Sequence, residues 1–289
     1  MAASEQAPTS GKYIVHHLTH LQNKTQTEVV DFSVINMDSV FWSITLGIIA
    51  CSLMYFAARR ATSGAPGRVQ ALVEMIYEMV DSQAKGIVHN ATSRIFVVPL
   101  AMVIFVWIFL MNFMDMLPVD LIPSIWHVAG PAMGAKDYMR VVPTADLSVT
   151  MGMAVAVLMI CIYYNIKIKG LGGWAHELVC APFGTSKNPI FAAILGVINF
   201  AMQMIEFVAK TVSHGMRLFG NLYAGELIFM LIALLGGSFA LSGSGLFVTF
   251  MHIVAGTAWT IFHILVITLQ AFVFMMLTLV YLGQAHDSH

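Results

Sequence analysis

The feature that most constrains this 289-residue sequence is a set of five apolar stretches, each long enough to cross a lipid bilayer. A hydrocarbon core about 30 Å thick requires roughly 20 apolar residues in helical conformation. Because lipid offers no hydrogen bonds, the crossing backbone must satisfy its own polar groups, as a helix does. We therefore predict an all-α integral membrane protein with spans at residues 40–58, 95–114, 147–166, 190–235 and 246–282.

The last two stretches are longer than one perpendicular crossing requires, so their helices must tilt, bend or lie partly along the membrane plane. Glycines between them predict a turn, and hence a hairpin of two long, tilted C-terminal helices. The turn glycines are Gly236, Gly237, Gly243 and Gly245. Residues 67–90 alternate apolar and acidic positions at helical spacing, which predicts an amphipathic helix on the membrane surface or against partners. The segment 171–189 is polar and rich in turn-forming residues.

Composition supports a membrane class and excludes several others. Hydrophobic residues make up 58% of the chain and charged residues only 10%, whereas soluble domains carry about 25% charged residues. The net charge of -1 excludes a basic nucleic-acid footprint. We expect one transmembrane domain, 38–289, behind a polar N-terminal tail, 1–37, that lacks a signal peptide.

No cofactor or metal site is expected. Cys51, Cys161 and Cys180 lie far apart and are interpreted as small buried hydrophobes. The tail histidines His16, His17 and His20 are either a metal site or, as we favour, part of a solvated tail. The chain also lacks a glycine-rich phosphate loop, so any nucleotide chemistry must reside in partners.

Basic residues predict the orientation of the spans, because they concentrate in cytoplasmic loops. Eight fall on one predicted side and four on the other, which places the N-terminus outside and the C-terminus in the cytoplasm. The larger group is Arg59, Arg60, Arg68, Lys85, Arg94, Lys167, Lys169 and Lys187, and the smaller is Lys12, Lys24, Lys136 and Arg140.

Four charged residues interrupt the fourth apolar stretch, although a charge at the bilayer centre costs about 2.5–3.5 kcal/mol or more. Polar residues there recur every three or four positions and so share one helix face, which must meet protein or water. This stripe consists of Gln203, Glu206, Lys210, Ser213, Arg217 and Asn221. Glu226 lies nine residues after Arg217 and therefore on the opposite face.

The last stretch carries a second polar set, at His252, Thr260, His263 and Gln270. His263 near Glu226 is a candidate proton relay, since histidine titrates near neutral pH; a hydrogen-bonded packing role is the alternative. Glu206 and Lys210 can neutralise each other at four-residue spacing, or Lys210 can extend to an interface. The uncharged polar residues can serve as interhelical hydrogen-bonding groups.

Neither charge neutralisation within the helix nor interhelical hydrogen bonding accounts for Arg217. Arginine stays protonated in essentially any environment, and the charged residue nearest to Arg217 on its face is Lys210, of the same sign. A permanent cation at this depth implies an anionic partner outside its helix, and outside this chain.

Three motifs carry a resemblance to a known family. Residues 216–227, MRLFGNLYAGEL, are similar to the RLFGN-x-x-AGE signature of subunit a of F-type ATP synthases. Residues 262–274, FHILVITLQAFVF, resemble the family's last-helix motif, and residues 111–118, MNFMDMLP, resemble the end of its second span. The motifs occur in the family's order, and the resemblance extends from about residue 38 to 281.

The resemblance implies a proton-translocating stator subunit with two offset half-channels and no catalytic site of its own. Arg217 corresponds to the arginine that faces a ring of c subunits, and Gln270 to the glutamine near it. The cytoplasmic half-channel would contain Asn221, Ser213 and Glu206, and the outer one Glu226, His263, Asn112 and Asp115. One departure concerns Gln203, where some relatives have glutamate; Glu206 is therefore the better candidate for the cytoplasmic path.

The resemblance also implies a bacterial inner membrane and three partners: the c-ring, the b-subunit peripheral stalk and the F1 ATPase sector. The Glu226 and His263 combination favours H+ over Na+ as the coupling ion. Two alternatives to this function are a stand-alone cation/proton secondary transporter and a structural scaffold anchored by Arg217. The absence of a convincing internal repeat in the sequence counts against inverted-repeat transporters.

Overall fold

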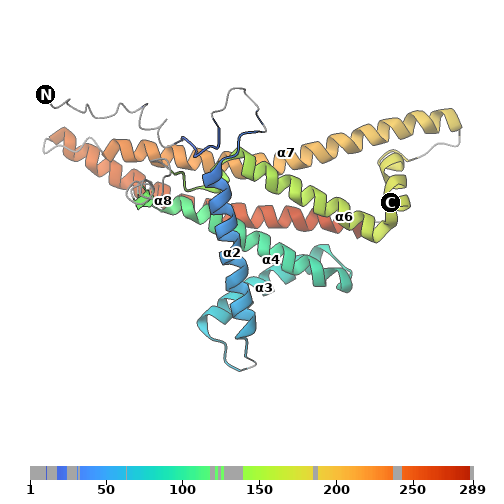
Figure 1. The fold of residues 1–289 in the computed structure, drawn as a ribbon, viewed down its shortest axis with the longest axis horizontal. Helices are drawn as coiled ribbons and strands as arrows, with labels where there is room; N and C mark the ends of the chain where they lie inside the picture. Colours follow the sequence, from blue (N-terminus) through green and yellow to red (C-terminus); the bar gives the residue numbers. More distant parts are fainter. Residues whose placement is uncertain are drawn as a thin grey trace. The chain divides into compact units, whose positions relative to one another are not determined.

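The computed structural model describes residues 11, 18–24, 31, 33–62, 64–117, 121–122, 125–126, 139–184, 188–236 and 243–286. Five helices in these ranges are long and apolar enough to cross a membrane. They are α2 (Met37–Arg59), α4 (Ala91–Phe113), α6 (Leu147–Cys180), α7 (Pro189–Gly236) and α8 (Gly243–Gly283) (Figure 1). The described part contains no β-strand, only an isolated bridge between Gln22 and Asn36. The prediction of an all-α integral membrane protein is confirmed.

A sixth helix, α3 (Arg68–Ile87), occupies the predicted amphipathic segment. Val80 and Ala84 on it are fully buried, whereas Val69, Leu72 and Met75 are exposed. Several residues used in the sequence arguments lie outside the described ranges: Lys12, His16, His17, Pro118, Lys136, Lys187 and Gly237.

Helix α6 continues beyond the predicted end of its span at residue 166. Its backbone leaves helical geometry at Gly170, with φ 73° and ψ 163°, a left-handed conformation that favours glycine. Residues 171–180, which we expected to be turn-rich, then resume a helix in a new direction. An ion pair of 2.8 Å between Lys169 and Glu177 connects the two sides of this kink. The polarity of the segment thus reflects exposure rather than irregular backbone.

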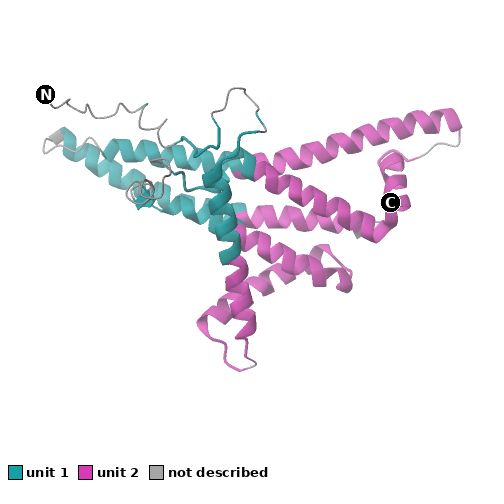
Figure 2. Ribbon diagram, viewed as in Figure 1, with its two compact units in different colours: residues 1–49, 108–149, 219–270 teal, residues 50–107, 150–218, 271–289 magenta. Residues whose placement is uncertain are grey.

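The chain forms two compact units, coloured separately in Figure 2. Unit 1 comprises residues 1–49, 108–149 and 219–270, and unit 2 comprises 50–107, 150–218 and 271–289. The unit boundaries fall inside all five long helices, so each of these helices contributes residues to both units. The candidate functional residues therefore divide into two sets.

Glycines on α7 allow close helix packing inside each unit. In unit 2, a Cβ at Gly215 would lie 2.6 Å from Met151 Sδ on α6, and one at Gly196 would lie 2.8 Å from a Val179 methyl carbon. In unit 1, a Cβ at Gly236 would lie 2.7 Å from the His252 ring on α8. Small residues at these contacts let helix backbones approach closely, as membrane helices require.

The turn that follows α6 is held by one buried side chain of α7. Asn199 donates through Nδ2 to the Val179 carbonyl at 2.9 Å and to the Gly184 carbonyl at 3.2 Å. Its Oδ1 accepts from the Phe183 amide at 3.2 Å. These bonds satisfy backbone groups that lipid cannot satisfy, and they fix the start of α7 relative to α6 within unit 2.

Candidate functional site

The first polar cluster, in unit 1, contains a buried acid and a buried histidine. Asp115 lies in a short 3-10 helix (Met114–Met116) that directly follows α4, and His263 lies on α8. Asp115 Oδ2 and His263 Nε2 are 2.6 Å apart, and both side chains are almost fully buried. Burial of a carboxylate is tolerated when it is paired and hydrogen-bonded, and His263 provides that partner for Asp115.

Glu226 pairs with Arg140 and not with His263, the partner that the sequence suggested. Its carboxylate forms a two-point contact with Arg140: Nε donates to Oε1 at 3.2 Å, and Nη2 pairs with Oε2. Both side chains are buried. Such a two-point arginine–carboxylate pair is among the stronger ionic contacts in proteins. The sequence analysis counted Arg140 only as a loop cation; its apolar flanks, Met139 and Val141–Val142, were the signal that it is buried.

Arg140 is itself held by the N-terminal tail. Its Nη1 lies 2.7 Å from His20 Nε2, and His20 Nδ1 lies 3.4 Å from Asp38 Oδ2. Asp38 also accepts from the backbone amides of Leu21, at 3.0 Å, and Arg140, at 3.3 Å. His20 is therefore part of a polar network rather than of a solvated tail, and His20 and Asp38 are residues that sequence reasoning missed.

The remaining predicted residues of unit 1 are either buried or exposed on α7. Asn112, fully buried, donates through Nδ2 to the Ile267 carbonyl at 3.5 Å. Gln270 is buried on α8, and Asn221 is exposed on α7. Gly225 leaves room for the His263 ring, because a Cβ at this position would collide with it. Helices α7 and α8 thus meet at the histidine that pairs with Asp115.

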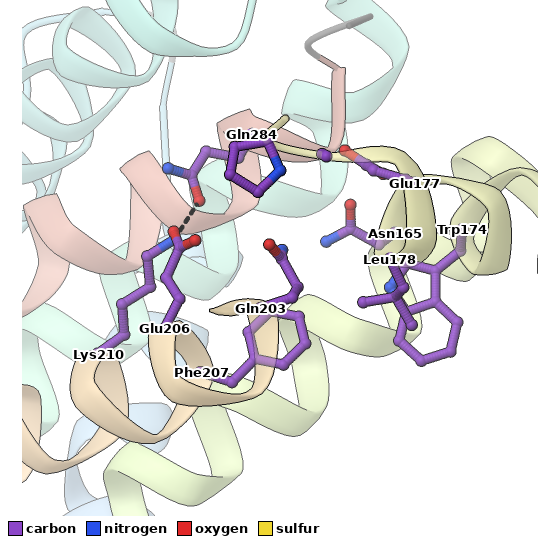
Figure 3. A pocket seen from close by; sticks show the side chains of 11 residues that line it. Asn165, Trp174, Glu177, Leu178, Gln203, Glu206, Phe207, Lys210 and Gln284 are labelled. Carbon is purple, nitrogen blue, oxygen red and sulfur yellow. Dashed lines mark hydrogen bonds and ion pairs between the residues drawn. The ribbon is translucent and has the colours of Figure 1, made fainter. Parts of the chain in front are cut away.

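The second polar cluster, in unit 2, follows the predicted stripe on α7. Glu206 and Lys210 form an ion pair of 2.5 Å between positions i and i+4, which confirms the interpretation that these residues neutralise each other. Lys210 also donates to Gln284 Oε1 at 2.9 Å, a contact drawn in Figure 3. Sequence reasoning missed Gln284, since its neutral side chain follows the last apolar stretch.

A pocket of about 400 Å³ opens beside this pair. Figure 3 shows Gln203, Glu206 and Lys210 of α7 across from Glu177, Trp174 and Asn165 of α6. Polar and charged groups from three helices therefore border one water-accessible space. Gln203 lines the same pocket as Glu206, but Glu206 carries the ionisable group.

Arg217 stands apart from every other charged residue that was predicted to function. Its side chain is exposed, and Nη2 donates a weak hydrogen bond to Ser213 Oγ at 3.4 Å. Among the residues that the structure describes, no carboxylate forms an ion pair with it. An exposed guanidinium on a membrane helix requires an anionic neighbour.

Ionisable residues on membrane-spanning helices, here Glu226, His263 and Arg217, typically mark ion or proton pathways, so the fold and site define a membrane protein that moves ions. Comparison with known proteins identifies the family within this class. The family model described as ATP synthase A chain matches residues 40–283, so this chain belongs to the ATP synthase A chain family.

Individual relatives agree along the whole chain. ATP synthase subunit a of Acidovorax sp. (strain JS42) is 66% identical over 289 residues and that of Paracidovorax citrulli (strain AAC00-1) is 65% identical over 292, with full coverage of both chains in each case. The subunit a of Psychrobacter sp. (strain PRwf-1) is 45% identical, covering 97% of this chain and 98% of the relative. These matches confirm the resemblance stated from the three motifs, and a stand-alone transporter is not favoured.

Proposed function

We propose that this chain is the proton-translocating stator subunit of an F-type ATP synthase, with the two polar clusters as its two half-channels. The observation that supports this most directly is Arg217, a permanent cation exposed on a membrane helix without a carboxylate partner among the described residues. Membrane carboxylates on a rotating ring of c subunits are the matching partner. Family membership and full-length relatives support the same function.

The outer half-channel would use the residues of unit 1. Asp115 and His263, paired at 2.6 Å, can exchange a proton, and Glu226 would take part beside them together with Asn112. Arg140 would hold the Glu226 carboxylate in place beside the pair through its two-point contact.

The cytoplasmic half-channel would use the residues of unit 2 and the adjoining end of α7. The pocket bordered by Glu206 provides a polar route, and Ser213 and Asn221 continue the exposed stripe along the helix. Gln270 would serve near the arginine, as the resemblance implies. In this assignment the N-terminus is outside, the C-terminus is cytoplasmic, and the membrane is the bacterial inner membrane.

The mechanism follows from these charges. A proton from outside neutralises a c-ring carboxylate, which can then rotate through lipid. On reaching the cytoplasmic route, the carboxylic acid loses its proton, because Arg217 stabilises the ionised form. The same fixed cation prevents protons from passing directly between the half-channels. Each charge crossing 100 mV releases about 2.3 kcal/mol, which drives rotation without bond chemistry in this chain.

The remaining partners would be the b-subunit peripheral stalk, which holds this subunit still, and the F1 sector, which performs the nucleotide chemistry. Purification tests this assignment: subunit c, subunit b and the ATPase subunits should co-isolate with this chain. Transport by the purified chain alone in liposomes would support an autonomous transporter instead.

Substitution of Arg217 tests the central residue. Arg217→Ala should abolish proton-driven ATP synthesis by the intact complex in liposomes, and Arg217→Lys should fail largely, because an ammonium group can deprotonate and has a different geometry. Arg60→Ala, an exposed arginine just after α2, is the matched control and should leave synthesis unchanged. Normal ATP-driven pumping by Arg217→Lys would contradict the proposal.

A further inference from the structure

His214, in unit 2, is a buried polar residue that the mechanism above does not use. It lies on α7, one turn before Arg217, and is only 2% exposed. Its ring packs on Phe274 with centroids 3.7 Å apart and against the edge of Tyr281 at 5.8 Å. Among the described residues, neither ring nitrogen has a hydrogen-bond partner. A neutral imidazole carries one donor and one acceptor, and a buried polar atom without a hydrogen-bond partner is destabilising.

A small cavity lined by His214 provides room for hydrogen-bond partners of the imidazole. It has a volume of about 40 Å³ and lies between α6, α7 and α8. Its polar lining residues are Cys161, Asn165, Lys210, Thr211, His214, Tyr281 and Gln284. Since one water molecule needs about 10–15 Å³ of such volume, the cavity accommodates about three. Water is also the ligand that can both donate to and accept from an imidazole.

The cavity adjoins the larger pocket of unit 2. Asn165, Phe207, Lys210 and Gln284 line both spaces. A water file in the cavity would therefore continue from the pocket that contains Glu206, past Lys210, to His214. Two proton routes would therefore start at the Glu206 pocket. One follows the exposed polar stripe of α7, and the other follows the water molecules in the cavity beside His214.

We infer that His214 is a positioning residue that anchors a short file of ordered water, extending the cytoplasmic half-channel from the Glu206 pocket into the interior of unit 2. The inference rests on the proposed function. His214 donates to one water molecule and accepts from another, which keeps the file oriented for proton transfer. Its close, tilted packing on Phe274 restricts the ring plane and hence the direction of both hydrogen bonds.

Two substitutions separate this role from packing. His214→Phe keeps an aromatic ring between Phe274 and Tyr281 but removes both polar atoms, whereas His214→Gln keeps a donor and an acceptor without the ring. In the intact complex in liposomes, ATP-driven proton pumping by His214→Phe should fall about tenfold, the effect of losing about one hydrogen bond's free energy in the transfer step. His214→Gln should recover most of the rate.

Unchanged pumping by His214→Phe, or equal loss in both variants, would overturn the inference. If His214→Phe does not assemble, cryo-electron microscopy of the wild-type complex decides: ordered water must lie within hydrogen-bond distance of a His214 ring nitrogen, and a well-resolved map without it overturns the inference. Arg217→Ala, measured in parallel, keeps the two proposals distinct. Pumping retained there would refute the stator function, whereas unchanged pumping in His214→Phe alone would refute only the water file.

Discussion

The two polar clusters differ in whether their charged side chains are buried and paired within the chain. In unit 1, Asp115 and Glu226 are buried, and each has a cationic or titratable partner from the same chain, His263 and Arg140. In unit 2, the charged stripe is exposed or half-exposed, and Arg217 forms a hydrogen bond with the neutral Ser213 and no ion pair with a described residue. Burial forces pairing within the chain, because an isolated buried charge is very costly. The exposed guanidinium of Arg217, in contrast, is accessible to an anionic group of another subunit.

This difference implies that mutations in the two clusters affect stability and proton transport differently. Loss of one member of a buried pair leaves the other as an uncompensated charge and should lower stability as well as transport. Loss of Arg217 removes no intrachain ion pair among the described residues, so it should stop transport while the complex still assembles. Measurements of stability and transport on the same variants therefore test the comparison.

The largest expected effect on stability comes from Arg140→Leu. It leaves the Glu226 carboxylate buried without its partner, which typically costs about 3–5 kcal/mol. We expect much less assembled complex in membranes and a lower melting temperature of what remains. Arg68→Leu, an exposed arginine at the start of α3, is the control. Normal assembly of Arg140→Leu would show that Glu226 does not depend on this pair.

Glu226→Gln should have a smaller effect on stability, about 1–3 kcal/mol, because the amide oxygen still accepts from Arg140 although the charge is lost. Proton transport should slow, but less than after the loss of Arg217, since Asp115 and His263 remain. The rate of ATP-driven pumping measures this, with Glu78→Gln on the exposed surface of α3 as the control. An unaffected rate would remove Glu226 from the proton route.

Gly225→Ala tests the space beside His263. The new Cβ would collide with the imidazole ring, and forcing an extra carbon into a packed site costs about 1–3 kcal/mol. The displaced ring should also lose its short contact with Asp115, so pumping should fall together with the melting temperature. Gly152→Ala on α6, where nothing lies within 4 Å of an added Cβ, should be neutral or slightly stabilising.

The smallest stability effect is expected for Glu206→Gln. The Glu206–Lys210 pair is partly exposed, and such pairs contribute about 0–1 kcal/mol. Lys210 also retains its bond to Gln284. Assembly and melting temperature should therefore be close to those of the wild type while pumping slows. A large loss of stability would mean that unit 2, like unit 1, depends on internal charge pairing.

Helical periodicity predicted much of this molecule. The spans follow from the length of each apolar run, and the polar stripe follows from the three- and four-residue spacing of Glu206, Lys210 and Arg217 on one helix. The Glu206–Lys210 pair could be foreseen because both residues belong to the same helix. Contacts between distant segments could not be foreseen in this way: Arg140 is 86 residues from Glu226, and His263 is 148 residues from Asp115.

The sequence by itself determined that this chain crosses a membrane, which residues share the polar face of α7, and to which family the chain belongs. It did so because hydrophobic run length, helical period and local motifs are properties of contiguous residues. Only the tertiary structure decided that Asp115 rather than Glu226 pairs with His263, that Arg140 and His20 enter the cluster, and that Arg217 stays without a carboxylate partner among the described residues. Those outcomes depend on which buried charges the packing of separate segments brings within hydrogen-bond distance.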